Sequence, residues 1–373
     1  MAEARPAIVV VLNGVTLDGD TRYVTDLLRF IDRKSVRLHV VSLLTPLEDQ
    51  AIGIQKLQVP VHSLDLPQAT GARAAWWTFA GALTLMNLFR KIGPELVHTV
   101  GDRADLVGRW AARLARVPRV LSTQRHPSAS PGLRRLMART TAGLPDLVIA
   151  PTEALARDVV DGQGIHPGRI RVIAPGVDLG NFASAASTPD LEGAGPLVGV
   201  VARMDDSKGI DTLVDAAAIL LRYHEDLRFV AVGSGVAGIG HIRRAQKLGL
   251  EDRFIVPGPR NDIPSVLAAL DVFVLPARRD GLPLALLEAL GAGVPCVATH
   301  GPSVDEALED DVHALLCVAD HPAFLADRID RVLTNGALAR RLADAGRALV
   351  QERFPAAATG AAHQSVYELL LET

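Results

Sequence analysis

The chain has 373 residues, 49% of them hydrophobic and 22% charged, and its formal net charge is -3. This length exceeds that of a typical single core and predicts two domains, and the composition excludes a largely disordered chain. The charge is uneven, because residues 1–180 hold 22 Lys and Arg against 16 Asp and Glu, whereas residues 181–373 hold 17 against 26.

Segments typical of strands and of helices alternate through the first half of the chain. Short β-branched runs occur at 7–13, 38–44, 95–100, 119–124, 147–152 and 170–176. Segments with helical periodicity separate most of them, and this alternation is typical of a parallel sheet with helices on both faces. The run at 7–13 is too short for a signal peptide and predicts a buried first strand, so we expect a cytoplasmic protein.

The segment AAWWTFAGALTLMNLF, at 74–89, is apolar almost throughout. It falls short of the ~20 residues that a membrane span needs. It therefore predicts a helix of the first domain, and contact with a membrane surface is the alternative. Nine arginines between residues 103 and 139 make this half basic, which suits anionic lipid headgroups or a phosphorylated acceptor. Too few aromatic residues are interleaved with them, and no nucleic-acid-binding module is recognisable, so we expect no nucleic-acid partner. Peripheral contact with the inner membrane face stays an option.

Residues 181–195 are mostly small and polar and include Gly and Pro, which predicts a linker. Strand signals then resume, at 196–203, 228–235, 253–258, 272–277, 295–299 and 314–318. The pattern predicts two Rossmann-like, doubly wound α/β domains, over residues 1–180 and 196–355. Residues 356–373 predict a C-terminal helix, and packing back on the N-terminal domain is one option for it. Ligands of such sheets bind at the carboxyl ends of strands.

The two cysteines, Cys296 and Cys317, lie in apolar segments that predict core strands. Buried free thiols are typical of a reducing compartment, and this spacing matches no metal site. We therefore expect neither a disulfide framework nor a bound metal.

The predicted second domain opens with VGVVARMDDSKGIDTLVDAAAILL. A buried strand is predicted to end at Arg203, and Lys208 and Gly209 precede a predicted helix. Two cations would then stand at the carboxyl end of a strand, beside helix amides that favour anions, and this combination suits a diphosphate. The alternative is two exposed basic residues in a polar turn.

Gly233, Gly235 and Gly238 match the G-x-G-x-x-G pattern of a dinucleotide-binding turn. However, the match follows the second strand of its domain instead of the first, and the nearest acids precede the next strand instead of ending it. The pattern therefore favours a glycine-rich turn near bound phosphate. A dehydrogenase that uses NAD is the weaker alternative.

The segment DVFVLPARRDGLPLALLEALGAGVPCVAT predicts a strand, a loop, a helix, a tight turn and a strand. Asp280 lies in the loop, and Pro283 suits the first helical turn because its missing N–H would have no intrahelical partner. Amides at the helix start can then point toward sugar hydroxyls or phosphate oxygens. These amides belong to Gly281, Leu282 and Leu284. Glu288 lies between one and two turns into the helix, so the two acids can reach different parts of one extended ligand.

Together these segments resemble the donor domain of glycosyltransferase family 4, whose members have the GT-B fold. The resemblance rests on the strand with its two cations, the glycine turn, the acid pair around Gly-Xaa-Pro, and GVPCVAT at 293–299. GPELVHTVGDRADLVGRWAARLARVPRVLST at 93–123 and DLVIAPTEALARDVV at 146–160 agree with the family's first domain. The likeness covers nearly the whole chain and implies two domains that face each other across a cleft.

The resemblance implies roles for individual residues. Arg203 and Lys208 would neutralise the diphosphate, Asp280 with the amides after it would hold the transferred sugar, and Glu288 would bind the ribose. Five further positions would contribute: Gly19 near the diphosphate, His126 near the reacting sugar, Gly233 in the glycine turn, and Arg260 and Ile263 at the base. Gly176 and Asp178 would occupy the domain junction.

Three positions depart from the family's usual pattern. Asp280 stands where glutamate is usual, the loop at Gly19 has one glycine where two are frequent, and Pro175 replaces a common asparagine. These departures leave the identity of the sugar open. For His126, a structural histidine is the alternative to a catalytic one.

The hypothesis is a hexosyltransferase-type glycosyltransferase that moves a sugar from a nucleotide diphosphate sugar to an acceptor hydroxyl, with retention and without a metal or other cofactor. The acceptor would be a glycan, a glycolipid or a small molecule, and a lipid-linked acceptor is one option. No carboxylate can be assigned as a nucleophile, so the leaving diphosphate would take the acceptor's proton. A non-catalytic sugar-nucleotide-binding protein, an NAD-dependent dehydrogenase, an epimerase and a phosphorylase are the alternatives.

Overall fold

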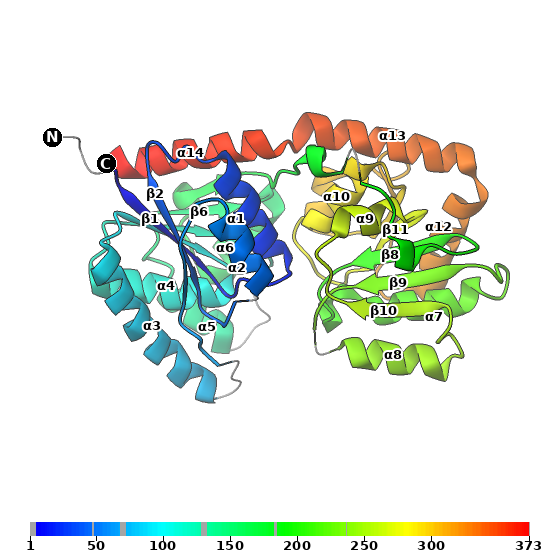
Figure 1. Ribbon diagram of the computed structural model, residues 1–373, viewed down its shortest axis with the longest axis horizontal. Helices are drawn as coiled ribbons and strands as arrows, with labels where there is room; N and C mark the ends of the chain where they lie inside the picture. Colours follow the sequence, from blue (N-terminus) through cyan, green and yellow to red (C-terminus); the bar gives the residue numbers. More distant parts are fainter. Residues whose placement is uncertain are drawn as a thin grey trace. The chain divides into compact units, whose positions relative to one another are not determined.

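The computed structural model describes residues 5–46, 48–67, 72–127, 133–182, 185–235 and 237–372 (Figure 1). The chain forms two units, each built on one parallel sheet. The first unit lies within residues 1–16, 20–175 and 356–373, and the second lies within 17–19 and 176–355. The predicted fold class, two doubly wound α/β domains, is confirmed.

The first unit contains a seven-stranded sheet in the order β3-β2-β1-β4-β5-β6-β7. Its strands are β1 (Ala7–Leu12), β2 (Arg37–Ser42), β3 (Val61–Ser63), β4 (Leu96–Val100), β5 (Arg119–Thr123), β6 (Leu147–Ala150) and β7 (Ile170–Val172). Its helices are α1 (Gly19–Phe30), α2 (Glu48–Gln55), α3 (Ala72–Ile92), α4 (Asp102–Ala115), α5 (Leu133–Thr140), α6 (Glu153–Gln163) and α14 (Ala356–Glu372), with a 3-10 turn η1 (Pro167–Arg169).

Alternate residues of the central strand β1 enter two separate cores. Ile8 and Val10 pack with α1 and α14 on one face of the sheet, and Val9 and Val11 pack with α3 and α4 on the other. Because successive side chains of a strand point to opposite faces, a strand covered on both sides must be apolar throughout. This is why the run at 7–13 has no polar alternation.

The second unit contains a six-stranded sheet in the order β10-β9-β8-β11-β12-β13. Its strands are β8 (Leu197–Val201), β9 (Arg228–Val232), β10 (Phe254–Gly258), β11 (Val272–Leu275), β12 (Cys296–Thr299) and β13 (Leu315–Cys317). Its helices are α7 (Ile210–Leu220), α8 (Gly238–Lys247), α9 (Ile263–Ala268), α10 (Leu284–Ala292), α11 (Pro302–Ala307), α12 (Pro322–Thr334) and α13 (Gly336–Arg353). Three 3-10 turns complete it: η2 (Leu179–Asn181), η3 (Pro189–Leu191) and η4 (Asp206–Lys208).

The strand order of the second sheet reverses between β8 and β11. These two strands are direct neighbours, with Val198 opposite Val272 and Gly199 opposite Phe273. In open α/β sheets, ligands bind beyond the carboxyl ends of the strands at such a switch point. The loops that follow β8 and β11 therefore begin side by side at the expected ligand position of this unit.

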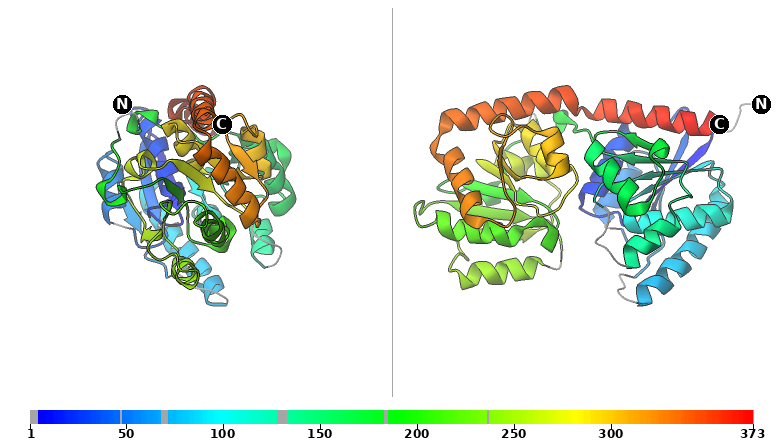
Figure 2. Two further views of the ribbon diagram at one scale, coloured as in Figure 1. Left: turned by 90° about the vertical axis from the view of Figure 1, so that its right-hand side faces the viewer. Right: turned by 180° about the vertical axis from the view of Figure 1, so that it is seen from behind.

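The C-terminal helix α14 belongs to the first unit (Figure 2). The hydroxyl of Tyr367 lies 2.8 Å from Nδ1 of His98 on β4, and Nε2 of His363 lies 2.8 Å from the hydroxyl of Tyr23 on α1. The carbonyl of Leu370 accepts a hydrogen bond of 3.0 Å from Arg119. Buried polar groups on three elements thus join α14 to the sheet and to α1.

Residues 181–195 differ from the predicted linker, because the part that the structure describes is packed on the second unit. The guanidinium of Arg228 donates to the carbonyls of Leu191 (2.8 Å), Gly193 (3.4 Å) and Gly195 (3.4 Å). The guanidinium of Arg260 also donates to the hydroxyl of Thr188 at 2.9 Å. Composition suggested a linker because small polar residues are typical of loops, but Arg228 binds its backbone carbonyls and Arg260 binds its side chains. Residues 183 and 184 lie outside the described part of the chain.

The arginines of α4 are not all on a solvated face. Arg109 is 1% exposed and forms an ion pair of 3.0 Å with Asp105, and its Nε donates to the Ser122 hydroxyl at 2.9 Å. Burial raises the pKa of Asp105 to about 6, and the charge of Arg109 opposes this rise. One cation of the basic half is therefore part of the core.

Both cysteines, Cys296 on β12 and Cys317 on β13, are buried and free. Burial raises the pKa of each thiol, to about 11 for Cys317. Within the described ranges, no helix combines the length and the apolar character that crossing a bilayer requires.

Candidate functional site

Lys208 and Asp280 are brought together at the switch point of the second sheet. Lys208 ends η4 after β8, Asp280 lies in the loop after β11, and the ammonium forms an ion pair with the carboxylate. The two side chains are 7% and 5% exposed. Among the residues that the structure describes, Asp280 is the hydrogen-bond partner of the Lys208 ammonium, which has three N–H groups. Two donors of the cation therefore remain for an anionic ligand.

The loop that carries Asp280 leads directly into α10. The other carboxylate oxygen of Asp280 accepts a hydrogen bond of 3.0 Å from the Gly281 amide. Pro283 is the N-cap residue and α10 begins at Leu284, which differs by one position from the prediction that Pro283 lies in the first turn. The proline has an extended backbone (ψ 131°) instead of a helical one, so its carbonyl accepts the amide of Leu286 at 3.2 Å.

The start of α10 offers backbone donors. Within the described part of the chain, the amides of Leu282, Leu284 and Ala285 form no hydrogen bond, as is usual for the first turn of a helix. The helix dipole adds partial positive charge at this end. The Gly281 amide, which we expected to face a ligand, is bonded to Asp280 instead. The remaining donors suit an anion or a sugar hydroxyl.

Glu288 and Arg203 lie in contrasting surroundings. Glu288 is the fifth residue of α10 and is 2% exposed, in agreement with its predicted depth in the helix. The side chain of Arg203 is 50% exposed and lies 3.4 Å from the carboxylate of Asp205. Arg203 is therefore the more exposed and the more weakly paired of the two predicted cations, because a half-exposed ion pair contributes little stability.

Arg278 was not singled out by sequence, and it joins the two loops of the site. Its Nε donates to Asp320 at 2.5 Å, and its terminal nitrogens donate to the carboxylate of Asp211 at 2.8 and 2.6 Å. Its own amide donates to the carbonyl of Ser207 at 2.8 Å. These bonds fix the residues on either side, Lys208 in one loop and Asp280 in the other. The only sequence signal was its place two residues before Asp280.

The same network sets two pKa values. The hydrogen bonds to Asp211 raise the pKa of Arg278 above its ordinary value. Burial raises the pKa of Asp211, but the hydrogen bonds and the charge of Arg278 outweigh burial and hold it below its ordinary value. Arg278 and Asp211 therefore stay charged across the physiological range.

The glycines of the G-x-G-x-x-G match have a packing role. Gly233 has φ 151°, and a Cβ there would lie 1.8 Å from the carbonyl oxygen of Ala202. Gly235 has φ 146°, and a Cβ there would lie 2.4 Å from the carbonyl oxygen of Met204. Both glycines let the turn after β9 approach the loop after β8. The close approach of two backbones thus explains the pattern without a dinucleotide.

Of the two residues predicted at the base, Arg260 lies in the loop before α9 and Ile263 is the first residue of that helix. Arg260 donates to Asp262 at 2.8 and 2.6 Å and forms an ion pair with Asp190. Hydrogen bonds from Arg260 lower the pKa of Asp190 to about 2. Ile263 is 4% exposed. Arg260 thus fastens the 181–195 segment to this loop.

The predicted residues Gly19 and His126 both lie near the start of α1. Gly19 is the first residue of the helix, and Asp20 follows it. Oδ1 of Asp20 lies 3.1 Å from the guanidinium of Arg125 and 3.6 Å from Nε2 of His126. Arg125 is 6% exposed and covers the ring of Tyr23 at 4.5 Å, whereas the His126 side chain is 34% exposed. Of these two neighbours, the histidine is the one accessible to a ligand.

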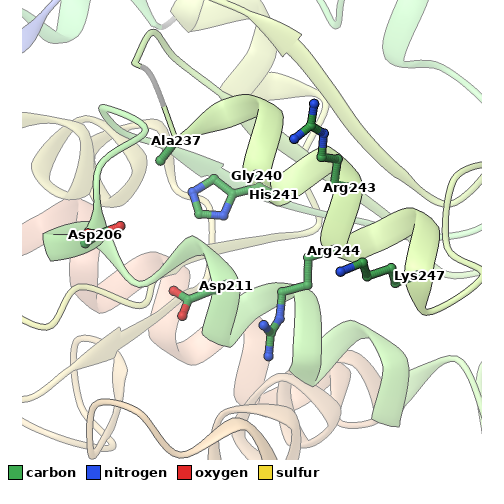
Figure 3. A pocket seen from close by; sticks show the side chains of 8 residues that line it. All are labelled: Asp206, Asp211, Ala237, Gly240, His241, Arg243, Arg244 and Lys247. Carbon is green, nitrogen blue, oxygen red and sulfur yellow. The ribbon is translucent and has the colours of Figure 1, made fainter.

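A surface pocket of about 460 Å³ lies between η4, α7 and α8 (Figure 3). It is lined by Asp206, Asp211, Ala237, Gly240, His241, Arg243, Arg244 and Lys247. Figure 3 shows the His241 ring extending from α8 toward Asp206 and Asp211. Among the described side chains, Nε2 of this histidine is buried without a hydrogen-bond partner. The lining includes neither Lys208 nor Asp280, so the pocket and the predicted donor site are different places.

Two family descriptions match consecutive parts of this chain. Residues 17–181 match Glycosyltransferase Family 4, and residues 188–349 match Glycosyl transferases group 1. The two matches together cover most of the chain. The second includes the loops that carry Lys208 and Asp280.

Two curated relatives are similar over part of their length. The chain is 31% identical over 242 residues to the UDP-Gal:alpha-D-GlcNAc-diphosphoundecaprenol alpha-1,3-galactosyltransferase of Escherichia coli. The aligned region covers 58% of this chain and 61% of that protein. It is 27% identical over 285 residues to the D-inositol 3-phosphate glycosyltransferase of Corynebacterium urealyticum. That alignment covers 69% of this chain and 67% of the relative. The chain thus spans under two thirds of the length of the first relative.

A solved structure extends the likeness to the whole fold. The structure of the Anabaena protein HepE in complex with UDP and glucose covers 98% of this chain and 99% of that one, with a TM-score of 0.80 and 20% sequence identity. At this identity the comparison establishes the fold, which is GT-B.

Proposed function

Since this chain belongs to glycosyltransferase family 4, we propose that it transfers a sugar from a nucleotide diphosphate sugar to an acceptor hydroxyl, with retention of the anomeric configuration. A uridine diphosphate sugar is the proposed donor. UDP-Gal in the name of the Escherichia coli relative, and UDP with glucose in the HepE structure, support this choice.

The observation that carries the proposal is the buried Lys208–Asp280 pair at the switch point of the second sheet, next to the unbonded amides of α10. In this proposal the two remaining donors of Lys208 bind the diphosphate, and Arg203 adds a second cation. The amides of Leu282 and Leu284, with Asp280, bind the sugar. Donors that are already in place when charge develops on a leaving group are a large source of catalysis.

The bond changes balance without a nucleophile from the protein. The bond between the anomeric carbon and the β-phosphate oxygen breaks, and the acceptor oxygen bonds to that carbon on the same face. The acceptor's proton passes to the departing diphosphate. Lys208 and Arg203 supply the charge that stabilises this leaving group, in place of a metal ion or another cofactor. The protein therefore acts through position and electrostatics.

The acceptor that we propose is a lipid-linked glycan hydroxyl. The name of the Escherichia coli relative includes a diphosphoundecaprenol acceptor, and the first half of this chain is basic. His126, the accessible neighbour of Asp20, is the proposed contact of the first unit with the reacting sugar. A peripheral position at a membrane follows from such an acceptor.

The test is a screen of uridine diphosphate sugars by thermal shift and by donor hydrolysis. We expect one donor to raise the unfolding temperature, and Lys208→Met to lower its turnover by about 10²–10³-fold. Lys247→Met, at an exposed lysine on α8, is the matched control and should leave turnover unchanged. Equal turnover of Lys208→Met and the control would mean that the phosphate site is wrongly placed.

A further inference from the structure

The outer faces of α3 and α4 expose large apolar side chains. Trp76, Phe79 and Leu83 on α3 are 65%, 58% and 38% exposed, and Trp110 and Leu114 on α4 are 39% and 42% exposed. Their spacings of three and four residues place each set on one stripe of its helix. Single exposed apolar residues are ordinary, but a cluster on adjacent helices is typical of an interaction surface. We call these five residues the α3–α4 face.

The two stripes form one surface because both helices cover the same face of the first sheet (Figures 1 and 2). The opposite sides of the helices enter one core with Val9 and Val11 of β1. Arg90 near the end of α3 donates to the carbonyl of Leu114 near the end of α4, at 3.4 Å. The helices are therefore parallel neighbours, and the sides that point away from the core face outward together.

The charge around the α3–α4 face is mainly positive. Accessible cations on the two helices and at the C-cap of α4 are Arg90, Lys91, Arg103, Arg113 and Arg116. Among the side chains of these helices that the structure describes, Asp102 is the accessible carboxylate, since Asp105 is buried against Arg109. Aromatic side chains are therefore surrounded by positive charge.

We propose that the α3–α4 face docks on an anionic lipid bilayer. Trp and Phe side chains suit the boundary between headgroups and acyl chains, and the surrounding arginines suit lipid phosphates. A second copy of the chain fits less well, because two such faces would bring like charges together. The docking surface is argued from exposed side chains, and its use in presenting a lipid-linked acceptor rests on the proposed function.

Tryptophan fluorescence tests this surface directly. The three tryptophans of the chain, Trp76, Trp77 and Trp110, all lie on α3 and α4. With the full chain, we expect vesicles of phosphatidylcholine and phosphatidylglycerol to shift the emission to the blue, and brominated lipids to quench it. Vesicles of phosphatidylcholine alone should bind much more weakly, and added salt should weaken binding to the anionic vesicles. Tryptophan emission that neither shifts nor is quenched when anionic vesicles are added would overturn the proposal.

Matched variants separate docking from catalysis. Trp76→Ser with Phe79→Ser should lower vesicle partitioning at least ~10-fold, because the double variant lacks the aromatic surface that docking would remove from water. Arg113→Gln should lower it about 5-fold. The control is Tyr223→Ser in the second unit, which removes a 78% exposed aromatic ring and should change nothing.

Each outcome has one meaning. Equal partitioning of the double variant and the control would refute the α3–α4 face as the membrane contact. Self-association in solution that the double variant abolishes, without vesicle binding by the natural sequence, would identify a second copy as the occupant and refute the proposal. All these variants should retain donor hydrolysis. If neither the natural sequence nor any variant hydrolysed a donor while vesicle binding was normal, that result would contradict the proposed function alone.

Discussion

Replacing Lys208 by methionine should separate the structural and catalytic roles of the Lys208–Asp280 pair. The two side chains are 7% and 5% exposed, so solvent screens the pair little. Removing the lysine takes the neutralising cation from a buried carboxylate, which costs about 3–5 kcal/mol of the free energy of unfolding. Removing both charges, in Lys208→Met with Asp280→Asn, should restore most of the lost stability, since the asparagine oxygen can still accept the hydrogen bond from the Gly281 amide.

The measurement is a double-mutant cycle from urea unfolding, followed by far-ultraviolet circular dichroism. Hydrogen exchange of the peptides in β8 and α7 would show that the loss lies in the second unit. We expect a coupling energy of about 2–3 kcal/mol. The double variant should be folded but should keep the turnover loss of about 10²–10³-fold, because it lacks the cation that binds the leaving group. Additive single effects, or recovered turnover in the double variant, would refute this reasoning.

The remaining predictions concern backbone packing, loop position and pH. Gly233→Ala should destabilise the second unit by at least ~1–3 kcal/mol, because its Cβ would lie 1.8 Å from a carbonyl oxygen at φ 151°. Gly240→Ala has open space around its Cβ and should not, and thermal unfolding compares the two variants. Arg278→Ala should raise the donor KM and lower kcat. Arg278→Lys should recover only part of the loss, because lysine cannot form the paired bonds to the Asp211 carboxylate. Steady-state kinetics of both variants tests this expectation. Burial lowers the pKa of His363 to about 4 from an ordinary value of 6.5, so unfolding takes up a proton between those pH values and stability falls as pH falls through them. In His363→Gln, the slope of stability against pH should be shallower by up to ~1.4 kcal/mol per pH unit, measured by tryptophan fluorescence, and an unchanged slope would contradict the assigned burial.

Much of the fold was predictable because a strand buried on both faces must be a continuous apolar run. The runs at 7–13 and 272–277 correspond to β1 and β11, with ends displaced by one or two residues. The exception is β3, which has three residues and a partly exposed sequence, VHS, at the edge of its sheet. Nothing in such a short segment distinguishes a strand from a loop.

The candidate site was predictable only in part. Arg203, Lys208 and Asp280 follow strands, so their places at the carboxyl edge could be inferred from local sequence. The ion pair between Lys208 and Asp280 could not, because it joins residues 72 positions apart and depends on β8 lying beside β11. The role of Arg278 was missed for the same reason, since its carboxylate partners lie in α7 and in the loop after β13.

The sequence by itself determined which segments are strands and helices, the order in which they alternate, and which loops carry charge or glycine. These properties depend on periodicity and on residue type over a few neighbours. Only the tertiary structure decided which loops meet, that the 181–195 segment packs on the second unit, and that Trp76 faces outward while Phe89 of the same helix is buried. Those outcomes depend on strand order and on which side of a helix the sheet covers, and an almost wholly apolar helix such as α3 carries no periodicity that would reveal it.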